Sequence, residues 1–157
     1  MIYASATVPV NPAGEIPLTR AQVWHGLVMK ARDARLFLPP GLCTRCEVIH
    51  DGDTHIVREA TIAGDDLREI ISFEAGSKVS FFQAGGPREG VIINELFEDE
   101  GGALQLRFYC LLGLRGKQPG GPEEQAEQAR MSSDGGYRTA LLSTLKRSRE
   151  LLGQGKL

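Results

Sequence analysis

An alternation of apolar and polar residues runs through the middle of the chain. It recurs in six stretches separated by glycine-rich or acidic turns, at residues 45–50, 54–62, 67–74, 78–84, 89–97 and 103–114. Such a two-residue period places successive side chains on opposite faces of a strand. Short links favour antiparallel neighbours, and residues 2–10 add one more strand, in which Pro9 is typical of an edge or a strand end. The pattern therefore predicts seven antiparallel strands.

Helical signals stand on either side of this block of strands. Thr19 and Gln22 form a candidate capping box for a helix that we expect to end near Ala31. Asp33 can cap a second, shorter helix over residues 34–38, where a Pro-Pro-Gly sequence follows and stops it.

A long helix is predicted near the end of the chain. Pro122 suits its first turn, and apolar residues then recur every three or four positions to form one face. Gly135 and Gly136 interrupt this pattern, so we expect a kink or break there, with residues 123–134 less firmly packed. The expected order is β-α-α-β-β-β-β-β-β-α, which is an α+β class.

Two charged residues lie on an otherwise apolar strand face. Arg58 and Glu69 alternate in step with isoleucine, leucine, alanine and phenylalanine in the hairpin 54–74. If Ile62 pairs with Leu67, Arg58 and Glu69 are diagonal neighbours. Buried charges are costly unless they are paired, hydrated or beside a cavity. The pair can therefore belong to a ligand cavity or be a structural ion pair, and a bulge that turns one of them outward is a third reading.

The predicted elements imply a partly empty interior. A curved seven-stranded sheet with one apolar face must be covered, and only one long helix is available for this. A single helix rarely fills the whole concave side of such a sheet. The sequence therefore predicts a pocket between the sheet and the C-terminal helix.

Composition narrows the class of protein. The chain has 157 residues, 41% of them hydrophobic, and a formal net charge of −2, so we expect a single globular domain over residues 1–157. Because no basic stripe is present, nucleic-acid binding has no support. No membrane span and no leader segment are evident, so a cytoplasmic location is the default expectation.

The three cysteines offer little chemistry. Cys43 and Cys46 match a C-x-x-C spacing, but a strand follows them where a thioredoxin-like motif would open a helix, and a zinc site lacks further ligands at short spacing. We interpret them as small residues at a strand start, and we expect no metal and no cofactor.

The order of elements resembles the helix-grip fold of the Bet v 1-like (START/SRPBCC) superfamily. Within it, the chain resembles a group of small AtaL-like bacterial and fungal proteins, long labelled a domain of unknown function. The resemblance rests on segments 8–12, 18–24, 57–59, 67–69 and 144–151. It implies a seven-stranded curved sheet around a long C-terminal helix. It also implies a hydrophobic ligand such as a lipid, polyketide or aromatic metabolite, since members of the superfamily hold such molecules and some act as cyclases, dehydratases or lyases.

The candidate ligand-binding residues are those expected to face the pocket. A pairing of strands 89–97 and 103–112 that aligns Ile93 and Glu95 with Phe108 would place these three on one face. The full set is Arg58, Glu69, Ile71, Phe73, Phe82 (or its neighbour Phe81), Ile93, Glu95, Phe108, Tyr137 and Leu141.

Three functions remain open at this stage. The first is a binding protein for a small hydrophobic molecule with one polar end. The second is an enzyme of cyclase, dehydratase or lyase type that uses Glu69 or Glu95 beside Arg58 as acid or base. The third is an interaction module, for example a homodimer formed through an exposed strand near residues 2–10.

Overall fold

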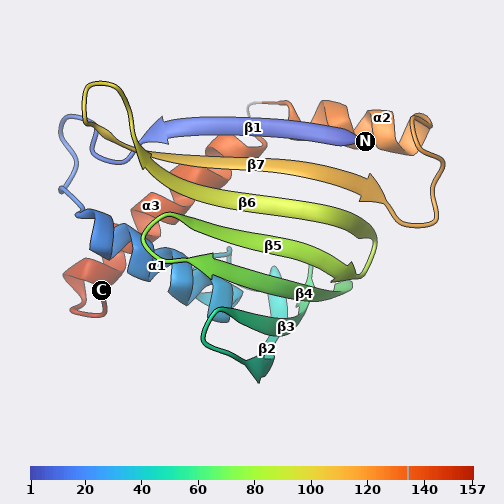
Figure 1. Cartoon of the computed structure of the whole chain (residues 1–157), viewed down its shortest axis with the longest axis horizontal. Helices are drawn as coiled ribbons and strands as arrows, with labels where there is room; N and C mark the ends of the chain where they lie inside the picture. Colours follow the sequence, from blue (N-terminus) through green and yellow to red (C-terminus); the bar gives the residue numbers. More distant parts are fainter. Residues whose placement is uncertain (134) are drawn as a thin grey trace.

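The protein is a curved antiparallel sheet with helices on its concave side (Figure 1). The computed structural model describes residues 1–133 and 135–157. The strands are β1 (Ile2–Pro9), β2 (Cys43–Asp51), β3 (His55–Ile62), β4 (Asp65–Glu74), β5 (Lys78–Gly85), β6 (Arg88–Glu98) and β7 (Leu104–Leu114). The helices are α1 (Arg20–Arg32), the 3₁₀ helix η1 (Ala34–Leu36), α2 (Pro122–Met131) and α3 (Tyr137–Gly153). The strand order is β1-β7-β6-β5-β4-β3-β2, which confirms the predicted helix-grip architecture.

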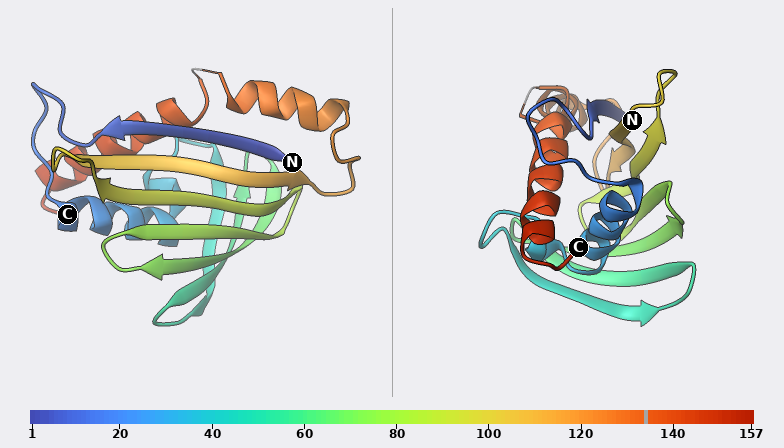
Figure 2. Two further views of the ribbon diagram at one scale, coloured as in Figure 1. Left: turned by 45° about the horizontal axis from the view of Figure 1, so that its top comes forward. Right: turned by 90° about the vertical axis from the view of Figure 1, so that its left-hand side faces the viewer.

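The sheet bends strongly around α3 and α1 (Figure 2). The main core lies in this bend, where apolar side chains of the inner sheet face meet those of α1 and α3, including Leu27, Ile56, Ile71, Leu106 and Leu145. A smaller apolar cluster lies between Met131, at the end of α2, and the β1–β7 pair. Burial of these side chains against the helices is the main favourable contribution to the fold.

The start of α1 agrees with the sequence prediction. The Thr19 hydroxyl accepts a hydrogen bond from the backbone N–H of Gln22, and the Gln22 side chain accepts one from the backbone N–H of Thr19. Asp33 ends α1 and caps η1, accepting from the backbone N–H of Arg35. These two caps fix where the two helices begin, and so fix which residues reach the sheet.

The β3–β4 hairpin is tighter than the sequence suggested. Ala63 and Gly64 form its turn with φ angles of 52° and 86°, and two central residues with positive φ are typical of a type I′ turn. Ile62 therefore pairs with Asp65 instead of Leu67, and Arg58 lies directly opposite Glu69. The predicted diagonal arrangement is wrong, while the predicted shared face is correct.

The register of β6 overturns part of the predicted site. A turn closed between Asp99 and Ala103 pairs Glu98 with Leu104, so Leu96 lies opposite Leu106 and Asn94 opposite Phe108. The even-numbered residues of β6 therefore point inward. The prediction that Ile93 and Glu95 share the inner face with Phe108 is wrong.

The same argument places Phe82 outside. Phe81 pairs with Ile71 on the inner face of the sheet, so its neighbour Phe82 must point to the convex side. Phe82 is 46% exposed, whereas Phe81 is 6% exposed. Of the two phenylalanines considered from the sequence, Phe81 is the inward one.

The C-terminal region breaks where the glycines predicted. Helix α2 ends at Met131 and α3 begins at Tyr137. Helix α2 lies along the edge strand β1, where the Gln128 side chain accepts from the backbone N–H of Tyr3 and donates to its carbonyl. This contact covers part of the sheet edge, so residues 122–131 are packed more firmly than expected.

Candidate functional site

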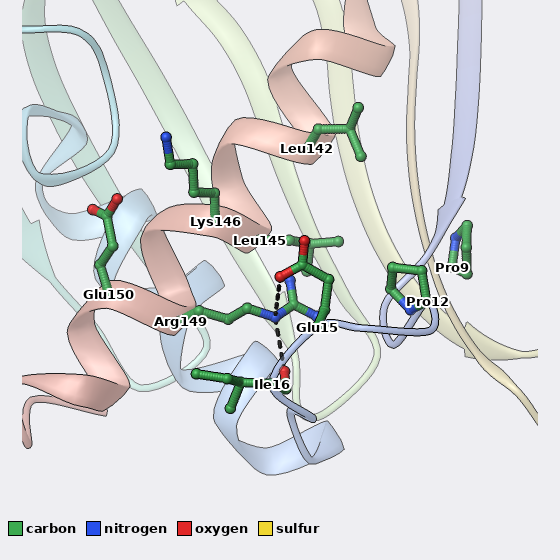
Figure 3. A pocket seen from close by; sticks show the side chains of 9 residues that line it. All are labelled: Pro9, Pro12, Glu15, Ile16, Leu142, Leu145, Lys146, Arg149 and Glu150. Atoms are coloured by element: carbon green, nitrogen blue, oxygen red, sulfur yellow. Dashed lines mark hydrogen bonds and ion pairs between the residues drawn. The ribbon is translucent and has the colours of Figure 1, made fainter.

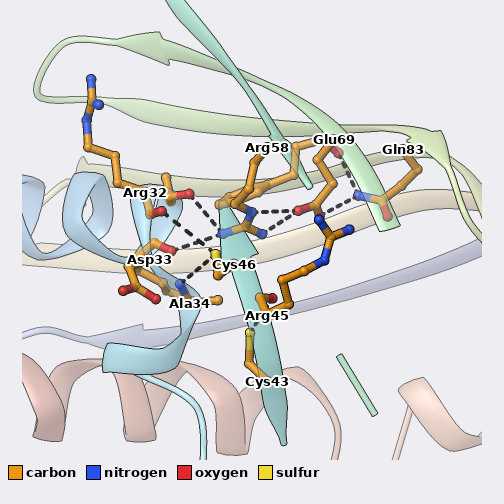
Figure 4. Close-up of polar contacts among 12 residues, drawn as sticks. Arg32, Asp33, Ala34, Cys43, Arg45, Cys46, Arg58, Glu69 and Gln83 are labelled. Atoms are coloured by element: carbon orange, nitrogen blue, oxygen red, sulfur yellow. Dashed lines mark hydrogen bonds and ion pairs between the residues drawn. The ribbon is translucent and has the colours of Figure 1, made fainter. Parts of the chain in front are cut away.

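The buried ion pair of Arg58 and Glu69 forms one wall of the interior (Figure 4). Only 4% of Arg58 and 5% of Glu69 is exposed. The Arg58 Nε donates to Glu69 Oε2 at 3.0 Å, and Arg58 Nη2 makes a second, short contact with the same oxygen. The other carboxylate oxygen accepts from Gln83 Nε2 at 3.0 Å. Both oxygens of Glu69 therefore have partners within the protein.

Arg58 also ties helix α1 to the sheet. Its Nη1 donates to the carbonyl oxygens of Lys30 and Ala31, at 3.1 and 2.8 Å. These carbonyls belong to the last turn of α1, where backbone acceptors lack helical partners and a cation is favourable. The pair is thus a structural ion pair that holds the C-terminal end of α1 against β3 and β4. Both oxygens of Glu69 and most N–H groups of Arg58 have partners in the protein.

A cavity of about 200 Å³ lies beside this pair. It is bounded by α1, η1, the inner sheet face and the first turn of α3, and its lining is mostly apolar. The lining residues are Lys30, Ala34, Leu38, Arg58, Ile62, Glu69, Phe81, Ile92, Asn94, Phe108, Tyr137 and Ala140. The cavity lies between the sheet and the C-terminal helix, as the element order predicted.

Lys30 brings an amine to the cavity wall. The residue is half-buried, its Nζ lies 4.3 Å from the centroid of the Phe108 ring, and it donates to Thr144 Oγ1 at 3.2 Å. Burial, reinforced by the nearby Arg58 cation, lowers the pKa of Lys30 to about 7, although Glu69 acts in the opposite direction. An ammonium loses hydration in an apolar setting, and a neighbouring cation adds repulsion. The amine is therefore partly neutral near pH 7.

Two further polar side chains of the lining have unsatisfied atoms. Within the described part of the chain, the buried atoms Asn94 Oδ1 and Tyr137 Oη have no hydrogen-bond partner. Burial, followed by the neighbouring Cys110 thiol, raises the pKa of the Tyr137 phenol, so it remains protonated at neutral pH. A buried polar atom without a partner costs free energy. Such atoms indicate a place where a polar group of a ligand would be accommodated favourably.

The predicted residues divide into three groups. Arg58, Glu69, Phe108 and Tyr137 line the cavity. Ile71, Phe73 and Leu141 instead pack within or against the main core, where Phe73 meets Trp24 edge to face. Phe82, Ile93 and Glu95 do not reach the interior. Whether the cavity-lining members bind a ligand stays a prediction.

Glu95 has a different role from the one predicted. It lies opposite Arg107 across β6 and β7, and Arg107 Nε donates to Glu95 Oε2 at 3.1 Å. This ion pair is on the convex side, together with a contact of Arg107 with the ring of Phe97. Glu95 is therefore unavailable as an acid or base inside the cavity.

Lys30 and Asn94 were not identified from the sequence as site residues, although the spacing of each residue indicated that it points inward. Lys30 follows Val23 and Leu27 at helical spacing, so it falls on the face of α1 that packs inward. Asn94 lies between Ile92 and Leu96 in strand alternation. Each is a polar residue in an apolar series, which is the same signal that identified Arg58 and Glu69.

A larger groove of about 540 Å³ lies outside α3 (Figure 3). It runs between the loop that follows β1 and the outer face of α3, with Pro12, Ile16 and Leu142 among its lining residues. Arg149 crosses it and donates to the carbonyls of Val10 and Ile16, at 2.5 and 2.8 Å. The groove is thus braced by a structural contact and is separate from the interior cavity.

The cysteines form neither a disulfide nor a metal site. All three are free, and within residues 1–133 and 135–157 no group of three or more His, Cys, Asp or Glu side chains could hold a metal ion. Cys46 Sγ accepts from the backbone N–H of Ala34 at 3.4 Å. Burial, followed by the nearby Cys46, raises the pKa of the Cys43 thiol. Cys43 is thus disfavoured as a thiolate nucleophile or ligand.

No helix among the described residues is long and apolar enough to cross a membrane. The possible homodimer through residues 2–10 stays a prediction.

Comparisons with known proteins agree with this architecture. The family model AtaL, described as acetylaranotin biosynthesis cluster protein L, matches residues 4–155. A search of curated proteins found no match.

Among solved structures, the chain is similar to the ZhuI aromatase/cyclase from Streptomyces sp. R1128, with a TM-score of 0.69, 15% identity, and coverage of 96% of this chain and 94% of that one. It is also similar to Ara h 8.0201, with a TM-score of 0.61, 10% identity, and coverage of 94% and 97%. The di-domain ARO/CYC StfQ from the steffimycin biosynthetic pathway gives a TM-score of 0.65 and 10% identity, and the match covers 97% of this chain and 52% of StfQ. At these identities the likeness shows the fold alone.

Proposed function

Because the chain belongs to the family of acetylaranotin biosynthesis cluster protein L and has an apolar interior cavity with unpaired polar groups, we propose that it binds a small hydrophobic molecule with one polar end. The proposal depends on one observation: the lining of the cavity is mostly apolar but includes a few polar side chains. Apolar side chains such as Phe81, Ile92 and Phe108 would cover most of the ligand. The polar end would lie near Lys30 and Asn94.

The size of the cavity limits the ligand. An empty apolar cavity of about 150 Å³ is large enough for benzene, and this one is about 200 Å³. A ligand that enters without rearrangement would therefore have roughly one ring and a small polar substituent. The cavity is partly open to solvent, so a longer molecule would place one end in it and extend outward, while a small aromatic metabolite would fit within it.

The polar end of the ligand would be recognised by groups that are not already paired. Arg58 and Glu69 bind each other, the end of α1 and Gln83, so a ligand would gain less by binding them than by binding a group that lacks a partner. Lys30 and Asn94 are better placed, because Asn94 Oδ1 has no partner and the Lys30 amine makes a single hydrogen bond, to Thr144, within the described part of the chain. We therefore assign orientation of the ligand to Lys30 and Asn94.

An enzyme of cyclase, dehydratase or lyase type is the second candidate. The ZhuI and StfQ structures are described as an aromatase/cyclase and an ARO/CYC protein, which is consistent with this class. The acid or base would not be Glu95, which lies outside, and Glu69 is held by Arg58 and Gln83. A group with a pKa near the working pH is best suited to proton transfer, so Lys30, with a pKa of about 7, would take that role.

The binding proposal can be tested by filling the cavity. Ala140 lines it, and Ala140→Leu would add bulk without removing a polar group. We expect 4-methylphenol to bind the wild-type protein saturably in isothermal titration calorimetry, and Ala140→Leu to weaken binding at least tenfold. Ala126→Leu, on the exposed side of α2, is the matched control and should leave affinity unchanged. Equal binding to all three proteins, or no binding to the wild type, would refute the proposal.

A further inference from the structure

The amine of Lys30 is held in place at the edge of an apolar space. Within the described part of the chain its Nζ makes one hydrogen bond, to Thr144 Oγ1 at 3.2 Å. That hydroxyl donates to the carbonyl of Ala140 at 2.8 Å, so it accepts from Lys30. One N–H of a neutral amine is thereby fixed by Thr144.

The surroundings of Lys30 favour the nucleophilic form of the amine. The charged groups that act on it are Arg58 on β3 and Glu69 on β4, and these two neutralise each other in their own ion pair. Thr144 on α3 accepts one N–H of the amine. The ring of Phe108 on β7 acts in opposition to burial, because a cation over a ring face is favourable. A lysine is activated when it is desolvated in a hydrophobic pocket or lies beside another cationic group. Burial is the larger of these two effects on Lys30, and the Arg58 cation is the second.

We propose that Lys30 forms a reversible imine with the carbonyl carbon of a small apolar aldehyde or ketone bound in the cavity. This inference rests on the proposed function and names the ligand class. The neutral amine forms a C–N bond, and the carbonyl oxygen takes a proton to give a carbinolamine. The C–O bond then breaks and one water leaves, so amine plus carbonyl gives imine plus water. The iminium form has gained one further proton from solution.

The cavity wall matches the needs of this reaction. Asn94 and the protonated Tyr137 are polar side chains of the lining that each keep one unpaired atom, which suits a carbinolamine that has both a hydroxyl group and an N–H. The apolar remainder, including Phe81, Ile92 and Phe108, limits the water that would hydrolyse the imine. Lys30 is the reacting residue, whereas Thr144 is a positioning residue that orients the amine.

Reductive trapping provides a direct test. The full chain is incubated with benzaldehyde and sodium cyanoborohydride at pH 7, and benzylated positions are mapped by peptide mass spectrometry. With a pKa of about 7, Lys30 is about half neutral at this pH, whereas an ordinary lysine is neutral in roughly one molecule in 2,500. We expect one benzyl group on Lys30, formed at least tenfold faster than on any of the other four lysines. The ratio of labelling at Lys30 to labelling at the other lysines should be greatest near pH 7 and should fall towards pH 10, where those lysines also become neutral.

Controls separate this reaction from ordinary surface labelling. Lys30→Met should abolish the fast phase, whereas Lys117→Met, which changes an exposed lysine paired with Glu123, should retain it. Peptide mapping separates any label on the N-terminal amine. Because the pH profile is measured on the wild-type protein, the test does not depend on the folding of a variant. Labelling spread evenly over the lysines, or a rate that rises only near pH 10, would overturn the proposal.

Benzyl alcohol distinguishes failure of this inference from failure of the proposed function. It has the same ring but no carbonyl carbon for the amine to attack. If benzyl alcohol binds in the cavity and Lys30 is not benzylated by benzaldehyde, the imine is refuted while the binding function stands. If neither compound binds, both proposals fail.

Discussion

The β3–β4 hairpin contains two arginine–glutamate pairs that differ mainly in the face on which they lie. Arg58 is opposite Glu69, and the next pair along the strands, Glu59 and Arg68, is reversed. The first pair is buried at about 5% exposure for each residue, whereas Arg68 is exposed and lies at the convex surface. The same residue types, one position apart, therefore experience very different surroundings.

This difference shows where charge is structurally important. The outer pair shares its carboxylate with Arg45, and its arginine is exposed to solvent, which weakens such contacts. The inner pair contacts Gln83 and the end of α1, and it joins α1 to the sheet beside the cavity that it helps to line. On the inner face, the Arg58–Glu69 pair therefore has a structural role. The unpaired atoms of Asn94 and Tyr137 lie in the same cavity and are available to a ligand.

The largest effect should come from removing half of the inner pair. Arg58→Leu leaves the Glu69 carboxylate buried without its cation and frees the carbonyls of Lys30 and Ala31. Breaking a buried pair in this way costs about 3–5 kcal/mol, so we expect a loss of that order in the free energy of unfolding from urea titration. Arg58→Leu combined with Glu69→Leu should cost less than Arg58→Leu alone. A loss below about 1 kcal/mol for Arg58→Leu would mean that the pair is not shielded from water.

A smaller effect should appear in the pH dependence of stability. The pKa of Lys30 is lowered to about 7 in the folded protein and is near 10.4 when unfolded. Between these values the unfolded chain binds more protons, so the unfolding free energy should rise with pH. Because Lys30 is only half-buried, we expect about 0.5–1 kcal/mol per pH unit, below the limiting value of about 1.4.

The comparison protein for this measurement is Lys30→Met, which keeps the aliphatic stem and lacks the amine. Its stability relative to wild type should be greatest near pH 7 and should decline towards pH 10. A difference that does not change with pH would show that the amine of Lys30 is solvated in the folded state.

Asn94→Leu should stabilise the protein while impairing its binding. The unpaired Oδ1 of Asn94 is buried, and a buried acceptor without a partner costs about 1–3 kcal/mol. We expect the leucine variant to gain about 1 kcal/mol in urea unfolding and to bind 4-methylphenol more weakly. Ser80, a buried polar residue on the next strand, provides a control through Ser80→Ala, which should not alter binding. A loss of stability in Asn94→Leu would indicate that the amide has a partner in solution.

The smallest effect should come from the outer pair. Arg68→Ala removes one partner of Glu59, which keeps Arg45 and water. We expect no resolvable change in the urea midpoint at physiological salt, since exposed pairs of this kind are screened. A clear destabilisation by Arg68→Ala would remove the contrast between the two faces of the hairpin.

The sequence was sufficient for the architecture because the relevant signals are local. Strand alternation, the capping box at Thr19 and the paired glycines at 135–136 each act within a few residues. The apolar face that contains Arg58 and Glu69 follows from alternation alone. These features do not depend on how one strand aligns with the next.

The residues that line the cavity were harder to predict, because they depend on how each strand is aligned with its neighbour. One residue of difference in the turn at Asp99–Ala103 decides whether Glu95 or Asn94 points inward, and sequence alone did not specify that turn. The position of Lys30 required knowing that the end of α1 packs over the cavity. Its lowered pKa depends mainly on burial and secondarily on Arg58, which lies 28 residues later in the chain.

The most direct test of the central claim is the location of a bound small molecule by intermolecular nuclear Overhauser effects with 4-methylphenol. The alternative binding site is a second apolar surface, a row of side chains on the convex face of the sheet that we call the convex row. Its members, each more than 40% exposed, are Tyr3, Ile70, Phe82 and Leu111. We predict contacts from the ligand to Phe108, Tyr137 and the Ala140 methyl group, and none to the convex row. Contacts confined to Tyr3, Phe82 and Leu111 would contradict the claim that the concave side is the ligand site.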